Sequence, residues 1–103
     1  MTRTIVGEVL PHAVWVDDVY LDPAASQAVF NHSPDGFAWG YHGSGPAQLA
    51  LAILLRVGVE RATAVRIHQH FKREHIAPLP MNQGFVMTLD VEAWADACAR
   101  EVR

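Results

Sequence analysis

The stretch from residue 46 to residue 57 constrains the fold of this chain most strongly. Its spacing predicts a helix of about three turns, which Gly58 ends because glycine tolerates the left-handed backbone conformation at a helix terminus. Apolar side chains occur nearly all round this helix; they include Leu49, Leu51, Ile53, Leu54 and Leu55. A helix without a solvated face has to be surrounded, so we expect the rest of the chain to enclose it as a central buried helix.

The length and composition fit one core of this kind. The chain has 103 residues, of which 50% are hydrophobic, and we expect residues 1–103 to form a single domain. Eight basic and eleven acidic residues make nucleic-acid binding through a basic surface an unfavourable hypothesis. A single cysteine excludes an internal disulfide and is typical of a reducing compartment. Without a signal peptide or a run of about 18 apolar residues, the sequence predicts a soluble cytoplasmic protein without membrane contact.

Two segments near the N-terminus predict antiparallel strands. Residues 5–10 and 13–21 are rich in β-branched and aromatic side chains, and a tight turn separates them. The acidic pair at 17–18 indicates either a bulge or an early end of the second strand. Alternation along that strand predicts three residues on one face: Val14, Val16 and Tyr20.

The segment from residue 22 to residue 36 contains a short element followed by a turn. Residues 22–30 fit either a short helix that Asp22 caps or a third strand. The sequence NHSPDG at 31–36 predicts a turn, because the residue before a proline avoids the helical region and Asp-Gly suits a type I turn.

The C-terminal half adds two helices and a strand. A helix is predicted over 61–75 by apolar spacing, a strand over 84–89, and a final helix after its cap Asp90. The order of elements does not alternate regularly. We therefore expect an α+β fold, with a small antiparallel sheet of three to four strands packed on one side by three helices.

The glycine-rich approach to the central helix is the main candidate binding site. Residues 39–46 read WGYHGSGP, and free amides at a helix start attract anions when glycines let the ligand come close. The candidate ligand-binding residues are Trp39, Tyr41, His42, Gly43, Ser44 and Gly45, with Arg66 and Arg73 as counter-charges. As a binding site, this set would suit a small anionic ligand such as a nucleotide.

The same segment also fits a structural role. Pro46 lacks an amide hydrogen and suits the first helical position, and Gln48 is expected to reach back as a capping residue. Phe37, Trp39 and Tyr41 alternate like one packed face of a strand, with the Tyr41 hydroxyl at the surface. This pattern favours a helix start and core aromatics over a ligand cradle.

Six histidines raise the question of a metal site. His68 and His70 are two residues apart and point in different directions on a helix, whereas His68 and His75 share a face two turns apart. His32 and His42 lie in loops on either side of the aromatic segment, and the sequence leaves open whether they meet. We expect no metal and no cofactor.

An enzyme built on His42 and Ser44 is disfavoured, because sequence neighbours rarely form a nucleophile and base pair. The sequence therefore predicts no catalytic residues.

Several motifs along the chain resemble those of one family. They are HSPDGF, WGY, GSGPAQLALAIL, HFKREHIAPLP and VEAW, in this order within residues 26–95. The chain is similar to a family of small bacterial and phage-encoded proteins known only as a domain of unknown function, with the signature WGYxGSGPAQLALAIL. The resemblance implies no activity. The family has an aromatic residue at the position of His68, which implies that His68 is a packing substitute.

These observations favour a non-enzymatic accessory module that binds a protein partner or a second copy of itself. The alternative is a small-ligand or nucleotide-binding protein that uses residues 39–46, with a role in conflict between phage and host.

Overall fold

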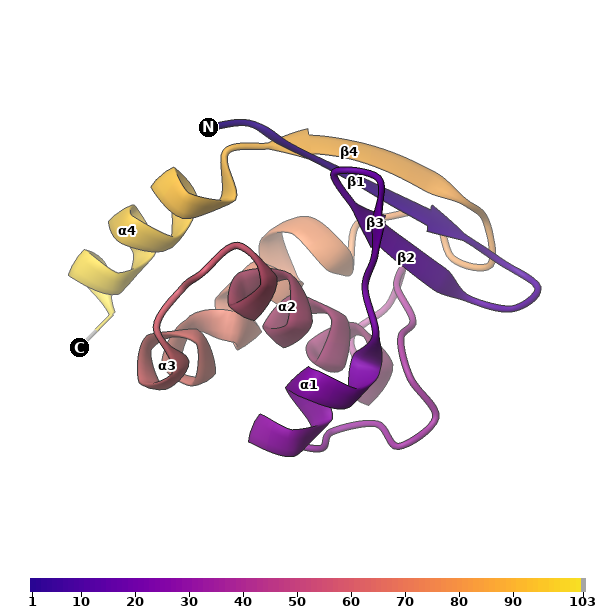
Figure 1. Cartoon of the computed structure of the whole chain (residues 1–103), viewed down its shortest axis with the longest axis horizontal. Helices are drawn as coiled ribbons and strands as arrows, with labels where there is room; N and C mark the ends of the chain where they lie inside the picture. Colours follow the sequence, from indigo (N-terminus) through magenta and orange to yellow (C-terminus); the bar gives the residue numbers. More distant parts are fainter. Residues whose placement is uncertain (103) are drawn as a thin grey trace.

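A four-stranded antiparallel sheet forms one layer of the molecule, and helices pack against one face of it (Figure 1). The computed structural model describes residues 1–102. The strands are β1 (Arg3–Glu8), β2 (Ala13–Val16), β3 (Val19–Tyr20) and β4 (Phe85–Leu89), in the order β3-β2-β1-β4. The last strand of the chain therefore pairs with the first. This arrangement confirms the predicted α+β class.

Four α-helices and one π-helical turn make up the second layer. They are α1 (Pro23–Val29), α2 (Ser44–Arg56), α3 (Arg61–Phe71), the π-helical turn η1 (Lys72–Ile76) and α4 (Val91–Glu101). The predicted helix over 61–75 is thus regular only to Phe71. At 22–30 the helix prediction was right and the strand alternative was wrong, because the Asp22 side chain accepts a hydrogen bond from the Ala24 amide at 2.9 Å and caps α1.

Helix α2 lies at the centre of the core, as predicted. Every residue from Gly45 to Leu54 is buried, and Gly58 follows with φ of +96°. The helix begins at Ser44, two residues earlier than expected, so Pro46 occupies the third helical position instead of the first.

A two-residue turn divides the predicted second strand into β2 and β3. Asp17 and Asp18 have φ of +50° and +66°, a combination that suits a tight hairpin between twisted strands. Of the two alternatives, the early end was therefore correct. The turn also changes the face of Tyr20, which pairs with Trp15 and lies on the outer face, whereas Val14 and Val16 are buried. The prediction that Tyr20 shares the face of Val14 and Val16 was wrong.

The first strand begins and ends two residues earlier than predicted, at Arg3–Glu8 in place of residues 5–10. Its inner face carries Ile5 and Gly7, which face the helices. Gly7 leaves room for the ring of Phe85, since a Cβ at this position would overlap that ring. The ring of Phe85 in turn packs edge-on against Trp39, with centroids 4.9 Å apart.

The segment that contains the aromatic alternation is irregular, so the predicted strand face of Phe37, Trp39 and Tyr41 was wrong. Gly40 has φ of +87°, and this left-handed conformation breaks the alternation. Phe37 and Trp39 point into the core, whereas Tyr41 turns to the surface.

Candidate functional site

Hydrogen bonds tie the WGY segment to the end of η1 and to the loop that precedes β4. The Gly40 amide donates to the carbonyl of Ile76 at 3.1 Å, and the Trp39 Nε1–H donates to the carbonyl of Gln83 at 2.8 Å. Trp39 is fully buried, as the core prediction required. Its ring is therefore a core anchor and does not offer a surface on which a ligand could stack.

Tyr41 lies over the start of α2, where the sequence suggested an anion site. A Cβ at Gly43 would lie 2.5 Å from Tyr41 Cε2, and a Cβ at Gly45 would lie 2.7 Å from the Cβ of Ala38. These two glycines therefore make room for neighbouring side chains. His42 and Ser44 are both exposed beside them, and Gly43 is the N-cap residue.

The two arginines proposed as counter-charges form hydrogen bonds elsewhere. Arg66 donates to the carbonyl of Val102 at 2.9 Å and so ties α3 to the end of α4. Arg73 donates to Nδ1 of His70 at 2.8 Å. Neither bond reaches residues 39–46, so the structure brings together Tyr41 and the two glycines without these arginines.

Gln48 organises a buried polar network that sequence reasoning missed. The expectation that Gln48 caps α2 was wrong, because its side chain is fully buried and makes no hydrogen bond to the start of the helix. Its Nε2 donates to Ser26 Oγ at 2.9 Å and to the Phe30 carbonyl at 3.1 Å, and its Oε1 accepts from the amides of His32 at 2.7 Å and Ser33 at 3.0 Å. The Gln48 amide thus donates two hydrogen bonds and accepts two, all with α1 and the loop that follows it. The signal in the sequence was one amide side chain within the otherwise apolar stretch 45–55 of this helix.

Next to this network, His32 contacts His68 rather than His42. Their Nε2 atoms lie 2.8 Å apart. Nδ1 of His68 lies 2.6 Å from the carbonyl of Val65, which only accepts, so Nδ1 carries the hydrogen and Nε2 of His68 accepts from His32. This arrangement holds two neutral rings with a single hydrogen between them. His68 is buried, in line with the packing role that the resemblance implied.

Burial lowers the pKa of His32, of His68 and of His75, and the charge of Lys72 lowers the first two further. An unfolded histidine titrates near 6.5, so below that pH the unfolded chain binds more protons than the folded one. We therefore expect stability to be fully present above about pH 6.5 and to decline as the pH falls toward the folded pKa values. The free energy of unfolding, measured in urea between pH 5 and 8, shows this decline. NMR titration gives the pKa values of the three histidines in the folded protein, and values of 6.5 or more would contradict the prediction.

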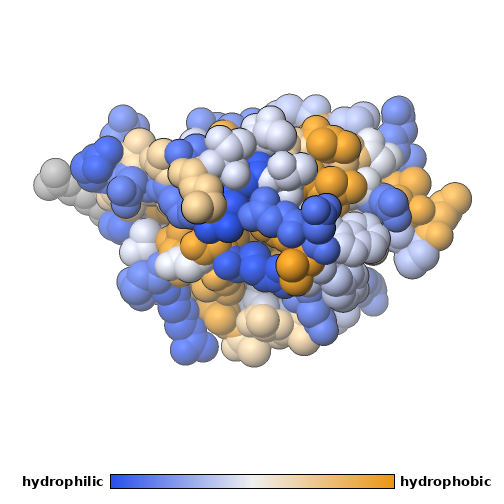
Figure 2. Space-filling model, turned by 45° about the horizontal axis from the view of Figure 1, so that its top comes forward, coloured by the Kyte–Doolittle hydropathy of each residue, from blue (hydrophilic) through white to orange (hydrophobic). Residues whose placement is uncertain are grey.

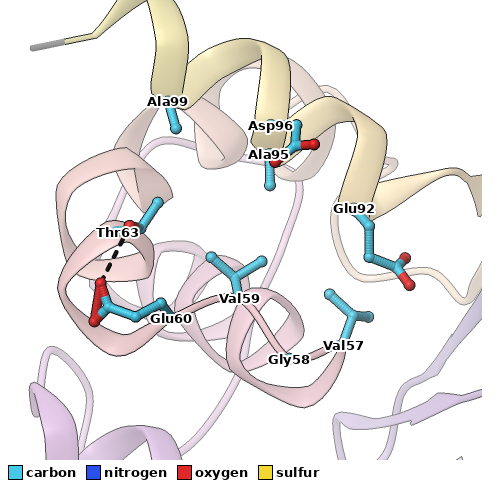
Figure 3. Close-up of a pocket in the computed structure, with 9 residues that line it drawn as sticks. All are labelled: Val57, Gly58, Val59, Glu60, Thr63, Glu92, Ala95, Asp96 and Ala99. Carbon is cyan, nitrogen blue, oxygen red and sulfur yellow. Dashed lines mark hydrogen bonds between the residues drawn. The ribbon is translucent and has the colours of Figure 1, made fainter.

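A cavity of about 320 Å³ lies between the α2–α3 turn and α4 (Figure 3). Val57, Val59 and Ala95 point into it, and carboxylates lie around it. Two of these carboxylates already serve the fold. Glu60 accepts from the Ala62 amide at 2.7 Å and caps α3, and Glu92 pairs with Arg3 at 2.7 Å. Two of the acidic side chains at this cavity therefore have structural roles, because Glu60 caps α3 and Glu92 links α4 to β1.

The outer face of the sheet carries an apolar row that crosses all four strands. Tyr20 pairs with Trp15, Trp15 with Val6, and Val6 with Val86. Val86 is 72% exposed and Tyr20 is 51% exposed, whereas the other two are half-buried. Figure 2 turns this side toward the viewer and shows hydrophobic side chains on its right-hand half, the side on which Figure 1 shows the strands.

The two edges of the sheet differ. At the β3 edge, Arg56 donates to the carbonyl of Tyr20 at 2.7 Å and to that of Val19 at 3.5 Å, so this short edge is capped. At the other edge, β4 has the sequence FVMTL, without a charged residue or a proline. Within residues 1–102, its backbone hydrogen bonds are those of the ladder with β1. β4 is therefore an unprotected edge strand.

Comparison with known proteins matches residues 2–97 to a family described as a family of unknown function (DUF6166). The chain belongs to this family. The match spans nearly the whole described structure, so the sheet, helices α1 to α3, the first part of α4 and the Gln48 network lie inside the matched range. No curated protein and no solved structure matches the chain.

Membership in DUF6166 assigns no activity, so function has to be argued from geometry. In this family member, no helix within residues 1–102 is both long and apolar enough to cross a membrane.

Proposed function

We propose that the protein is a self-assembling binding module in which β4 pairs with β4 of a second copy. The observation that carries this proposal is the difference between the two edges of the sheet. Arg56 occupies the carbonyls of the short β3 edge, whereas the five residues of β4 present an uncharged edge. Soluble proteins usually protect such an edge with charges, proline or a covering segment.

The backbone groups available for this pairing can be named. The Thr4 carbonyl accepts from the Asp17 amide at 2.8 Å, so Thr4 and Val6 direct their backbone groups toward β2. The backbone N–H and C=O groups of successive residues in a strand point to opposite sides. The residues on either side of Thr4 and Val6 therefore form hydrogen bonds with β4, and their partners there are Phe85, Met87 and Leu89. The N–H and C=O groups of Val86 and Thr88 therefore point away from the sheet.

A second copy suits this edge because two identical strands related by a twofold axis pair in antiparallel fashion. No charge lies in β4, so the two strands bring no like charges opposite each other. Each backbone hydrogen bond contributes only about 0.5 to 1.5 kcal/mol net, and the edge offers only the five residues of β4. We therefore expect a concentration-dependent dimer.

A small-ligand role at residues 39–46 has less support from the geometry. Trp39 is buried, and Arg66 and Arg73 donate to Val102 and His70.

The change Thr88→Pro tests the proposal. Proline removes the N–H that points outward and leaves the ladder with β1 intact, since Thr88 does not donate to β1. We expect the dissociation constant of the dimer to rise at least tenfold, as measured by sedimentation over about 10 µM to 1 mM.

The control is Thr88→Val, which keeps the N–H and the β-branched shape and should leave the dimer unchanged. Circular dichroism shows whether both variants keep the fold. Equal assembly of the proline variant and the wild type, with the fold intact, would show that β4 is not the contact.

A further inference from the structure

The contact between His32 and His68 holds a loop against helix α3. His32 lies in residues 30–36, which follow α1 and lead toward α2. Its amide donates to Gln48 Oε1 on α2 at 2.7 Å, and its ring reaches His68 on α3 with the two Nε2 atoms 2.8 Å apart. The ring of Phe30 stacks on that of His32, with centroids 4.2 Å apart and 18° between the planes. One residue thus ties the loop to two helices.

The remainder of the loop has few contacts with the core. None of residues 30–36 is buried, and Phe30 is 49% exposed. Besides Gln48, the side chain that holds the loop is Gln27 of α1, which donates to the carbonyl of Ser33 at 2.8 Å. Segments with few buried contacts open at a lower free-energy cost than the core does. The loop can therefore open while α2 stays folded.

The contact between the two rings requires an uncharged acceptor. Nδ1 of His68 carries the hydrogen that it donates to the Val65 carbonyl, so Nε2 of His68 has to accept from His32. A proton on this Nε2 would set two N–H groups against each other and break the contact. A proton on Nδ1 of His32 would leave the contact in place but would put a charge on a partly buried ring. The closed pair thus excludes a proton at one atom and disfavours it at the other.

The groups around the pair also oppose protonation. The charged side chain that acts on both rings is Lys72, the first residue of η1, and it repels any further positive charge. Helix α1 carries no charged side chain, and on α2 and α3 the polar neighbours are the neutral amides of Gln48 and Gln69. Within residues 1–102, neither ring forms an ion pair with a carboxylate, and Asp35 in the loop is exposed. Opening the loop lets each ring take up a proton near its ordinary pKa of about 6.5.

We propose that the His32–His68 contact is a pH switch: in mildly acidic solution the pair takes up protons, and residues 30–36 open away from α3 while the sheet and α2 stay folded. Opening uncovers the Gln48 amide, which otherwise accepts from the loop. The switch is separate from the β4 edge and so goes beyond the proposed function. It is also distinct from the decline in global stability, because the loop opens before the chain unfolds.

Hydrogen exchange followed by NMR from about pH 7.5 to about pH 5 tests the switch. The protection of the His32 and Ser33 amides, relative to an unfolded chain at the same pH, measures how often the loop opens. The open pair binds up to two protons and the closed pair none. We therefore expect this protection to fall by roughly tenfold to a hundredfold for each pH unit below about 6.5.

The amides of Leu51 and Ile53 in α2 report on global unfolding and should stay better protected than the loop amides at every pH. Equal protection of loop and α2 amides throughout would overturn the proposal, and so would loop protection that does not change with pH.

Glutamine variants separate this pair from the other histidines. His32→Gln keeps an N–H donor but does not titrate, so the fall should become at most about tenfold per pH unit. Adding His68→Gln should remove the fall altogether. The control is His70→Gln, on the same helix, whose ring contacts Arg73 and whose loss should leave the wild-type fall.

The same pH dependence in the wild type and the double variant would show that another group opens the loop. Should the double variant fail to fold, His32→Gln decides alone, because a fall as steep as that of the wild type would equally exclude the pair.

Discussion

Replacing Gln48 with leucine should lower the free energy of unfolding by about 3 to 5 kcal/mol, because it leaves buried polar groups without partners. The change keeps the volume of the helix side chain but removes an amide that serves four groups on α1 and the following loop. Each buried group left unpaired costs about 1 to 3 kcal/mol, and the loop can turn some of them toward water. Chemical unfolding of both proteins measures the difference, and a melting temperature lower by more than about 12 °C is expected.

The matched control is Gln27→Leu. Gln27 lies on α1, is half-buried, and donates to the carbonyl of the same loop residue, Ser33, at 2.8 Å. Because water can replace this bond, its loss should cost about 1 kcal/mol or less. Equal costs for the two changes would mean that the buried network around Gln48 does not hold the loop to α2.

Replacing Gly40 with alanine should cost at least about 3 kcal/mol. The residue has φ of +87°, which alone costs an L-residue about 1 to 2 kcal/mol. In addition, a Cβ would lie 2.5 Å from Met81 Cα and 2.8 Å from the Leu79 carbonyl oxygen. These are backbone atoms and cannot rotate away, so the loop before β4 would have to move. We expect the loss in urea unfolding, together with changed amide shifts for residues 76–83.

Gly58→Ala separates the clash from the backbone strain. Gly58 has φ of +96°, close to that of Gly40, but nothing lies within 4 Å of its Cβ position. Its replacement should therefore cost only the strain, about 1 to 2 kcal/mol. If both variants lost the same stability, the close contact with the Met81 backbone would not explain why residue 40 has to be glycine.

The candidate site was predictable only in part. The sequence correctly predicted that the segment from residue 39 leads into a buried helix and that Trp39 lies in the core, but it placed the start of that helix two residues too late. It did not show that the ring of Tyr41 lies over Gly43, because that contact depends on the left-handed turn at Gly40. The row from Tyr20 to Val86 was equally out of reach, since a shift of one residue in strand register moves every side chain to the other face.

Periodicity and end signals along the chain were enough to predict the α+β class, the buried central helix and the cap at Asp90, because these depend on residues a few positions apart. The cap at Asp22 was one of two alternatives for residues 22–30, and the structure decided between them. Tertiary structure alone decided which distant groups meet. Gln48 bonds to groups up to 22 residues away, and His32 meets His68 across 36 residues. β1 lies between β2 and β4, which exposes the β4 edge. Such pairings follow from how the layers pack, and no local pattern encodes them.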